Sequence, residues 1–277
     1  MNEFQIDVSP RKQQLKDEYE RLQQEYSELV AKRDDLLQHE GPLLEALYMT
    51  TIGQLLYEEL CLQQDIALLK YERDLLQAYE NRGEEPDFEE ILEKVEETAK
   101  SFNENLKKEE EKRKKAKAFV DEHQEEQSKQ KEAERIELKA IYKRLVHRLH
   151  PDLHPEQTEW ERELFLKVQE AYEKQDLNTL RQLEEELNSG MSSEEMDNET
   201  VEEWEERIQK LKDLISAIKE EITRIENGFP FTYRTNLYDQ EWVSATQEEI
   251  RVRIELLQKE KERLEKIIEY IKMQNHG

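Results

Sequence analysis

The chain has 277 residues, and its 68 acidic residues outnumber its 42 basic ones, which gives a formal net charge of −26. So acidic a chain is a poor candidate for general nucleic-acid binding. Charged residues make up 40% of the sequence, whereas glycine and proline occur only six times each, a composition typical of long helices. We therefore expect an all-α protein in which elongated helical and coiled-coil arms carry a small helix–loop–helix unit, with essentially no sheet.

The sequence also indicates a compartment. Its single cysteine, Cys61, excludes an intrachain disulfide and fits a reducing cytosol. The first residues lack the basic-then-apolar pattern of a signal peptide, and no apolar run approaches the length that spans a membrane. We expect a cytoplasmic protein without a membrane partner.

Residues 1–106 are predicted to form a helical hairpin followed by a third helix. Over residues 10–39, apolar side chains recur in steps of three and four, with Arg33 at one of these positions. Gly41-Pro42 is expected to end this helix, because proline lacks an N–H donor and restricts the residue before it. The apolar positions are Leu15, Tyr19, Leu22, Tyr26, Leu29 and Leu36.

The next segment, residues 43–79, is the most apolar part of the chain. It has too many apolar positions for a single seam, so this helix should contact more than one neighbour. Asn81-Arg82-Gly83 is predicted to close it, and the third helix is predicted to begin near Pro86-Asp87.

Residues 107–135 carry mixed charges and almost no apolar stripe, which predicts a solvated helix of roughly 40 Å at 1.5 Å per residue. A basic block lies at residues 112–115, between acidic neighbours and without interleaved aromatic residues. That setting is typical of a solvated helix rather than of a nucleic-acid contact.

The most informative segment is residues 136–188, which contains His150-Pro151-Asp152. Pro151 should end the helix before it, and Thr158-x-x-Glu161 is a capping box that should begin the next. The pattern therefore predicts two short helices joined by a loop that presents His150 and Asp152. The two apolar stripes are Leu138, Ile141, Tyr142, Leu145, Val146 and Leu149 before the loop, and Leu164, Phe165, Val168, Ala171 and Tyr172 after it.

Residues 136–175 resemble the J domain of DnaJ-type co-chaperones. The family's second helix commonly reads Tyr-Arg-Lys-Leu-Ala-x-x-x-His-Pro-Asp, and the matching segment here runs from Tyr142 to Asp152. The family's third helix often carries Phe-x-x-Ile-x-x-Ala-Tyr, which is matched by Phe165, Val168, Ala171 and Tyr172. The resemblance implies a docking loop at His150-Pro151-Asp152 that engages a DnaK-type (70-kDa heat-shock) chaperone and promotes its ATP hydrolysis.

Charge supports a docking face on the first of these helices. Residues 138–151 contain no acidic residue, although the chain as a whole is strongly acidic. A basic face on an acidic protein indicates an acidic partner. The resemblance implies that this partner is the ATPase domain of the DnaK-type chaperone. The cations that would hold it are Lys139, Lys143, Arg144 and Arg148.

The segment departs from the family pattern in two places. A J domain has a short first helix, but no Asp-Tyr-Tyr-x-x-Leu-like segment precedes residue 136, so the apolar stripe needs another cover. One candidate is a following helix with Leu177, Leu180, Leu183 and Leu187, preceded by Asp176 as its N-cap. The loop also carries Leu153 and His154 where the family often has lysine and asparagine.

The loop also contains residue types that can bind a metal ion. His147, His150, His154 and Asp152 could bind a transition metal, but the proline between them breaks the helix and no second ligand cluster follows. No Gly-rich phosphate loop, Gly-x-Ser-x-Gly elbow or Cys/His pairing occurs. We therefore expect no metal, no cofactor and no enzymatic activity of the protein's own.

Residues 189–197 are predicted to be a linker, and residues 198–277 an antiparallel coiled-coil hairpin. Its first helix alternates steps of three and four from Val201 to Ile225, and its second begins at the cap Ser244-x-x-Gln247. The connection between them is aromatic, and it either closes the end of the hairpin or forms an exposed patch for a partner. Among its aromatic residues are Phe229, Phe231, Tyr233 and Trp242.

The resemblance implies a co-chaperone, whose helical arms would recruit a client protein of unknown identity and whose heptads could support a homo-oligomer. The alternative is a coiled-coil scaffold in which the J-like unit survives only as a packing module. The two differ in whether a J-like unit that lacks its first helix still holds its loop in an active geometry.

Overall fold

Helix is the only extended regular structure in residues 10–124, 129–190 and 200–274, the parts of the chain that the computed structural model describes. The expectation of an all-α protein is therefore confirmed. The helices divide between two units: unit 1 comprises residues 1–42 and 125–232, and unit 2 comprises residues 43–124 and 233–277.

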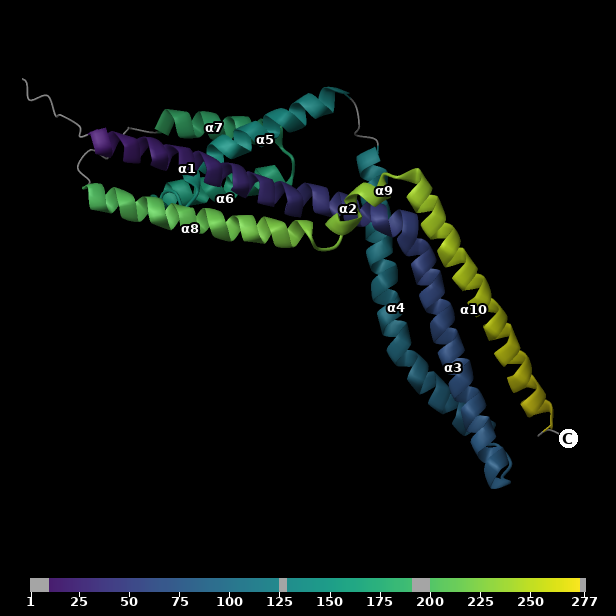
Figure 1. Cartoon of the computed structure of the whole chain (residues 1–277). Helices are drawn as coiled ribbons and strands as arrows, with labels where there is room; N and C mark the ends of the chain where they lie inside the picture. Colours follow the sequence, from purple (N-terminus) through teal and green to yellow (C-terminus); the bar gives the residue numbers. More distant parts are fainter. Residues whose placement is uncertain (1–9, 125–128, 191–199, 275–277) are drawn as a thin grey trace, which may run out of the picture. The chain divides into compact units, whose positions relative to one another are not determined.

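Unit 1 is built around α1 (Pro10–Asp35), which packs against α8 (Val201–Glu226) and against α5 (Lys129–Leu149). Figure 1 shows α8 running alongside α1. Helices α6 (Glu159–Glu173) and α7 (Leu177–Gly190) pack against α5 and against each other. The J-like segment thus forms a small bundle of its own helices, and α1 joins that bundle from far away in the sequence.

Helices α1 and α8 are parallel and in a constant register. Four ion pairs join them, each between residues 194 positions apart, and each pair lies seven residues from the next. Such heptad-spaced pairs are typical of the edges of a parallel coiled coil. The pairs are Arg11–Glu205 at 2.7 Å, Glu18–Lys212 at 2.8 Å, Glu25–Lys219 at 2.6 Å and Lys32–Glu226 at 2.9 Å.

Unit 2 is built around α3 (Gln54–Arg82), which packs against both α10 (Gln240–Gln274) and α4 (Phe88–Gln124). The prediction that this apolar helix contacts more than one neighbour is confirmed. Helices α3 and α10 are also parallel, since Glu59, Asp65 and Glu72 pair in the same order with Arg253, Lys261 and Lys272. The short helix α9 (Arg234–Leu237) packs against α10.

The predicted C-terminal hairpin is corrected by these pairings. The heptad face of α8 is covered by α1, and that of α10 is covered by α3. The same pairings replace the predicted N-terminal hairpin, because α1 and α3 each pack against a C-terminal helix. The stripes were identified correctly, but a heptad repeat does not say which other stripe in the chain it meets.

The predicted break at Gly41-Pro42 is also corrected, because the backbone stays helical there. A π-helical turn, η1 (Leu36–Glu40), leads into α2 (Gly41–Tyr48), and a second such turn, η2 (Met49–Gly53), leads into α3. The Gly41 N–H donates to the Leu36 carbonyl five residues earlier. Such a widened turn tolerates the absence of an N–H donor at Pro42. A Cβ on Gly41 would lie 2.7 Å from that carbonyl oxygen and 3.3 Å from the Phe231 ring, so the position requires glycine.

The other helix ends agree with the sequence in part. Gly83 closes α3 with φ 68°, and the Asp87 side chain accepts hydrogen bonds from the Glu89 and Glu90 N–H groups at the start of α4. The predicted cap at Ser244 is wrong. The Asp239 side chain accepts from the Glu241 and Trp242 N–H groups and caps α10, so the helix begins at Gln240, five residues earlier than a cap at Ser244 predicts.

The aromatic connection before α10 includes a short turn of 3₁₀-helix, η3 (Phe231–Tyr233). Phe231 is buried, and the Tyr233 ring lies against those of Tyr48 and Trp242, with centroids 5.0 and 6.1 Å away. Phe229 is half-exposed. Most of these rings therefore pack, but they do not close the end of the predicted hairpin, because α8 and α10 pair with other helices.

The predicted polar helix over residues 107–135 is divided between two elements. Its first part belongs to α4, where the Arg113 guanidinium lies 4.5 Å from the Tyr57 ring centroid and anchors the helix to α3. Its last part belongs to α5, and residues 125–128 lie outside the described residues. Most of the predicted linker, from residue 191 onward, also lies outside them.

Candidate functional site

The site is the loop between α5 and α6, and the two predicted stripes support it from below. All six apolar residues of the α5 stripe and all five of the α6 stripe are buried. The predicted capping box is present: the Thr158 hydroxyl accepts from the Glu161 N–H, and the Glu161 carboxylate accepts from the Thr158 N–H. Both helices therefore end and begin where the sequence predicts.

Backbone hydrogen bonds fix the loop closely to the end of α5. The His150 N–H donates to the Val146 carbonyl at 2.9 Å, and the His150 carbonyl accepts from the N–H groups of Leu153 and His154, both at 3.0 Å. Leu153 is buried, and the Gln157 side chain donates to the Leu149 carbonyl. The loop is therefore a packed turn in which Pro151 and Asp152 remain exposed.

His150 forms the floor of the loop and is only 9% exposed. Its ring meets the rings of Tyr26 and Phe165 edge to face, with centroids 5.3 and 5.4 Å away. Its Nδ1 accepts from the Asp152 N–H at 3.2 Å, so the neutral imidazole carries its proton on Nε2. Burial lowers the pKa of His150, although the nearby Asp152 carboxylate opposes the shift.

Asp152 is the exposed charge of the loop, and α1 anchors it. The Tyr26 hydroxyl donates to the Asp152 Oδ2 at 2.6 Å, while 44% of the Asp152 side chain stays accessible. Burial and this hydrogen bond to the carboxylate raise the pKa of Tyr26. The phenol therefore remains a donor at neutral pH and holds one carboxylate oxygen in place, which leaves the rest of the group free for a partner.

The cover that the J-like unit needs comes largely from α1. Tyr142 is fully buried and stacks on Tyr172, with ring centroids 3.7 Å apart and planes 9° apart. The Tyr142 hydroxyl donates to the Asp34 Oδ2 at 2.6 Å, and burial together with this carboxylate raises the pKa of Tyr142. Helix α7 adds to the cover as predicted, since Leu180, Leu183 and Leu187 are buried.

A histidine just beyond α1 extends this contact to α6. The His39 Nε2 lies 2.9 Å from the Tyr172 carbonyl oxygen, and its Nδ1 lies 3.2 Å from the Asp35 carboxylate. Burial tends to raise the pKa of Asp35, but its bonds to His39 and Lys139 prevail and lower it. Asp35 is therefore charged at neutral pH and joins α1, α5 and α6.

Each of the four predicted docking cations already has a partner within unit 1. Two partners come from α1 and two from α7, and three of the four are carboxylates, so most of the basic face is locally neutralised. All four side chains nevertheless lie at the surface or near it. The pairs are Lys139–Asp35 at 2.7 Å, Lys143–Glu28, Arg144–Glu184 at 2.7 Å and Arg148–Asn188.

The three histidines of the loop do not converge. The His154 Nε2 lies 2.8 Å from the His147 carbonyl oxygen, whereas the His150 ring lies between Tyr26 and Phe165. Burial and the neighbouring His154 lower the pKa of His147. No group of three His, Cys, Asp or Glu side chains in the described parts of the chain is arranged to hold a metal ion.

Sequence reasoning missed the residues of α1 that meet the loop. Its heptad pattern marked Tyr26 as a seam residue, and this is the residue that contacts His150 and Asp152. A second buried row escaped notice because it contains polar residues. That row consists of Gln23, Ser27, Val30 and Asp34.

The comparisons add no relative to this geometry: no protein family, no curated protein and no solved structure matches the chain. In the described residues, no helix is both long enough and apolar enough to cross a bilayer.

Proposed function

We propose that the protein is a J-domain-like co-chaperone, in which His150-Pro151-Asp152 engages a DnaK-type chaperone and promotes its ATP hydrolysis. The observation that carries this proposal is the Asp152 carboxylate, exposed at the end of the α5–α6 pair and held by the Tyr26 hydroxyl. A charged group fixed before the partner arrives loses little conformational entropy on binding. The protein itself performs no covalent chemistry in this proposal.

Helix α1 covers the apolar stripe of α5, and this packing supports the proposal. It takes the place of the first J-domain helix that the sequence lacks. A J-like unit without a first helix would expose the stripe of α5. Here Tyr142 and the other stripe residues are buried, and backbone hydrogen bonds of His150, Leu153 and His154 hold the loop above them. The geometry of the loop therefore does not depend on a first helix placed directly before it.

The internal ion pairs do not prevent docking. Exposed ion pairs contribute between about 0 and 1 kcal/mol each, so an acidic surface can exchange with Glu28 and Glu184 at little cost. Lys143, Arg144 and Arg148 would then hold the ATPase domain beside the loop, with Lys139 at the end of the same face. The remaining helices would recruit a client protein.

The direct test is single-turnover ATP hydrolysis by a DnaK-type chaperone from the same organism. We expect the native protein to accelerate hydrolysis and Asp152→Asn to abolish the acceleration. Glu163→Gln is the matched control, because it removes an exposed carboxylate of α6 away from the loop and should leave the acceleration unchanged. Absence of acceleration by the native protein, with an active J protein as positive control, would refute the proposal.

A second experiment tests the docking face. Reversal of Lys143, Arg144 and Arg148 to glutamate should eliminate binding of the chaperone, because charge of the wrong sign then faces its acidic surface. Circular dichroism of the variant checks that the helices persist. Binding that survives in a folded variant would show that this face is not the docking surface.

The alternative function is a scaffold in which the J-like unit only packs. The pairing of all four cations within unit 1 favours it, since these charges already have a structural role. It predicts a folded protein that neither binds nor stimulates a DnaK-type chaperone. Loss of stability in Asp152→Asn, with no stimulation of the chaperone by the native protein, would also fit this alternative.

A further inference from the structure

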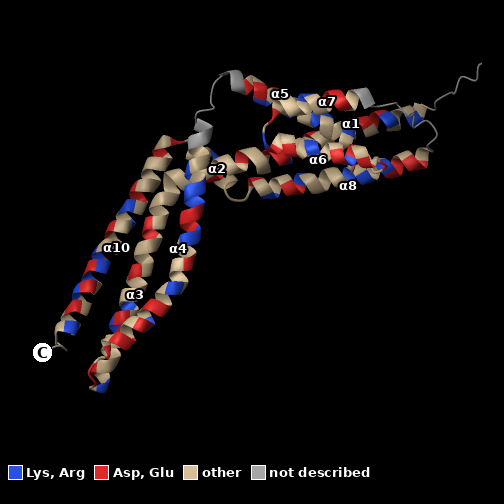
Figure 2. Ribbon diagram, turned by 180° about the vertical axis from the view of Figure 1, so that it is seen from behind, with Lys and Arg blue, Asp and Glu red and all other residues tan. Residues whose placement is uncertain are grey.

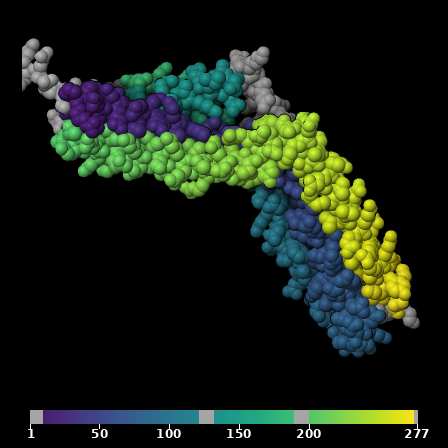
Figure 3. All heavy atoms as spheres, viewed as in Figure 1, coloured from purple at the N-terminus to yellow at the C-terminus, as the bar shows by residue number. Residues whose placement is uncertain are grey.

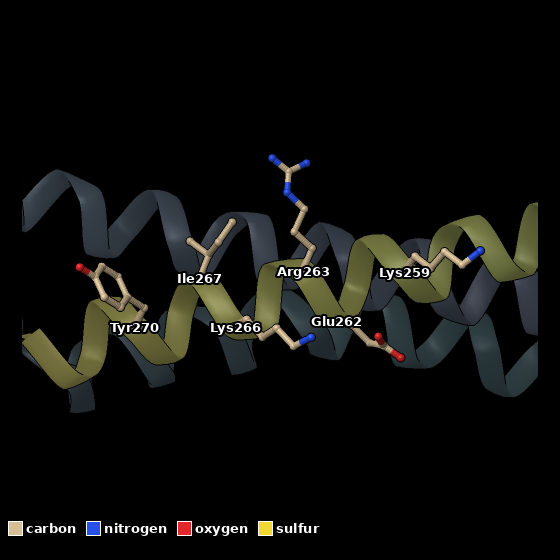
Figure 4. Close-up of a pocket in the computed structure, with 6 residues that line it drawn as sticks. All are labelled: Lys259, Glu262, Arg263, Lys266, Ile267 and Tyr270. Atoms are coloured by element: carbon tan, nitrogen blue, oxygen red, sulfur yellow. The ribbon is translucent and has the colours of Figure 1, made fainter.

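The open side of α10 carries charges of both signs, so it does not select one class of ligand. Figure 3 shows α10, in yellow, with one side against α3 and the other open, and Figure 2 shows acidic and basic residues interleaved along it. A shallow hollow on this helix (Figure 4) is lined by Lys259, Glu262, Arg263, Lys266, Ile267 and Tyr270. An acid thus stands among three cations, and a ligand of either sign would meet a group that repels it.

The buried ring of His150, in contrast, lies close to two groups of Asp152 that differ in hydrogen-bonding character. The His150 Nδ1 accepts from the Asp152 N–H at 3.2 Å, and it lies 3.8 Å from the Asp152 Oδ2. The N–H can only donate, whereas the carboxylate can only accept. A neutral imidazole accepts at one nitrogen, but an imidazolium donates at both. The protonation state of His150 therefore decides which of the two groups its Nδ1 can bind.

Two aromatic rings leave the imidazole little room to turn a charged Nδ1 toward solvent. Tyr26 of α1 and Phe165 of α6 meet it edge to face, with centroids 5.3 and 5.4 Å away, and the His150 side chain is only 11% exposed. A buried charge is stable only where a neighbouring group pairs with it and accepts its hydrogen bond. The Asp152 carboxylate can do both, and it belongs to the same loop.

The charges around His150 keep it neutral at neutral pH. Burial lowers its pKa; the Asp152 and Asp34 carboxylates oppose this shift, whereas Arg33 and His154 add to it. The ring therefore takes up its proton below the ordinary value of 6.5. The groups that face it are Asp152 and His154 of the loop, Tyr26, Arg33 and Asp34 of α1, and the uncharged Phe165 of α6.

We propose that protonation of His150 is a switch that withdraws the Asp152 carboxylate from the surface of the loop. A proton from solvent adds to Nδ1, and the Asp152 N–H loses its acceptor. The carboxylate then moves onto the imidazolium, while the Tyr26 hydroxyl still donates to its Oδ2. The adjacent cation neutralises the charge that a partner would meet. The effect on a chaperone rests on the proposed function, but the exchange of partners at Nδ1 does not.

Carbon NMR of the full chain, labelled at the aspartate carboxyl carbons, tests this exchange. The signal of Asp152 is the one that is missing from Asp152→Asn. Between about pH 7.5 and about pH 5.5, which bracket the ordinary histidine value of about 6.5, it should shift in step with the ring signals of His150. An Asp152 signal that does not follow the titration of His150 would overturn the proposal.

Three variants assign the shift to one ring. His150→Gln should remove it, because glutamine keeps an acceptor for the Asp152 N–H but takes up no proton in this range. His147→Gln and His154→Gln are matched controls that remove the other histidines of the segment, and they should leave the shift in place. Circular dichroism at each pH checks that the helices persist. A shift that persists in His150→Gln, or that disappears in either control, would overturn the proposal.

Single-turnover ATP hydrolysis measures the consequence for the proposed function. The ratio of stimulated to unstimulated hydrolysis should fall at least about twofold between about pH 7.5 and about pH 5.5. A DnaJ-type protein checks that the chaperone still responds at the lower pH. A constant ratio, despite a shift of the Asp152 signal, would overturn the switch. Absence of stimulation at every pH would instead refute the proposed function, and the carbon titration alone would then decide whether Asp152 changes partner.

Discussion

Unit 1 and unit 2 are each built around one N-terminal helix, but the more polar of the two helices is the more deeply buried. Helix α1 buries eight residues, among them Gln23, Ser27 and Asp34, whereas the leucine-rich α3 buries only three. The reason is the number of neighbours. Helix α1 meets the J-like bundle on one side and α8 along another, while the neighbours of α3 leave many of its leucines half-exposed.

The comparison teaches that the helix next to the candidate site is recognised by its buried polar residues and not by its content of apolar residues. Asp34 is buried because the Tyr142 hydroxyl donates to it, and Tyr26 is buried because it contacts the loop. Among the described residues, unit 2 buries one charged side chain, Glu59, which pairs with Arg253 of α10. Its central cluster is apolar and is formed by Leu76, Ile91 and Ile268. Four predictions test this difference.

The largest effect is expected from the same leucine-to-alanine change in both units. Leu145 of α5 is fully buried, so Leu145→Ala should destabilise unit 1 by about 2–5 kcal/mol. Leu62 of α3 is only half-buried, so Leu62→Ala should destabilise unit 2 by about 1–2 kcal/mol, because less apolar surface is lost. Urea denaturation of each variant measures both values. Equal losses would contradict the difference in packing between the units.

The next largest effect concerns a single hydroxyl. Tyr142→Phe removes one of the two donors to buried Asp34, because Arg33 also donates to it, and should cost about 1–3 kcal/mol. Tyr79→Phe in unit 2 is the matched control, since its hydroxyl donates to the exposed Glu90 at 2.7 Å and its loss should leave stability unchanged. Thermal and urea unfolding compare the two, and a large effect at Tyr79 would break the comparison.

Acidification should destabilise unit 1. Folding lowers the pKa of His150 and of His147 below the ordinary value of 6.5, so the unfolded chain binds more protons just below that pH. The contribution is therefore complete above pH 6.5 and is lost as the pH falls through the lowered values. Each proton taken up on unfolding adds at most about 1.4 kcal/mol per pH unit.

Urea midpoints between pH 7.5 and pH 5, values chosen to bracket an ordinary histidine pKa of about 6.5, measure this dependence. His150→Gln should make the profile shallower, because one of the two titrating groups is removed. A profile that stays as steep in this variant would show that His150 does not contribute.

The smallest effect concerns the docking face. Glu28→Gln frees Lys143, which should strengthen binding of a DnaK-type chaperone by a few-fold, within the range of about 0–1 kcal/mol for an exposed pair. Glu25→Gln is the control, because it breaks an equally exposed pair of the same helix with α8. Calorimetric titration of the chaperone measures both, and equal effects would argue against a specific role for Glu28.

Local patterns predicted much of the site. The two stripes, the end of α5 at Pro151 and the capping box at Thr158 all follow from residues within a few turns of one another. The all-α fold and the stripe that α8 presents to α1 are likewise visible in the sequence. These features depend on periodicity and on turn chemistry, which a single segment contains in full.

The pairing of the helices could not be predicted, because it depends on segments 194 residues apart. Arg11 and Glu205 are one of several possible matches in a chain with so many charges. The contact of α1 with α5 was hidden for a different reason. Ser27 and Asp34 look like surface residues, but both are buried. Asp34 accepts from the Tyr142 hydroxyl of a distant helix as well as from its neighbour Arg33, and only the second of these donors is visible in the local sequence.

The central claim is that α1 completes the His-Pro-Asp loop, and a double-mutant cycle tests it most directly. Urea denaturation of the native protein, Tyr26→Phe, Asp152→Asn and the double variant gives the coupling between the two side chains. Their hydrogen bond of 2.6 Å predicts a favourable coupling of about 1 kcal/mol. Strictly additive effects would contradict the claim, because they would mean that Tyr26 does not hold Asp152.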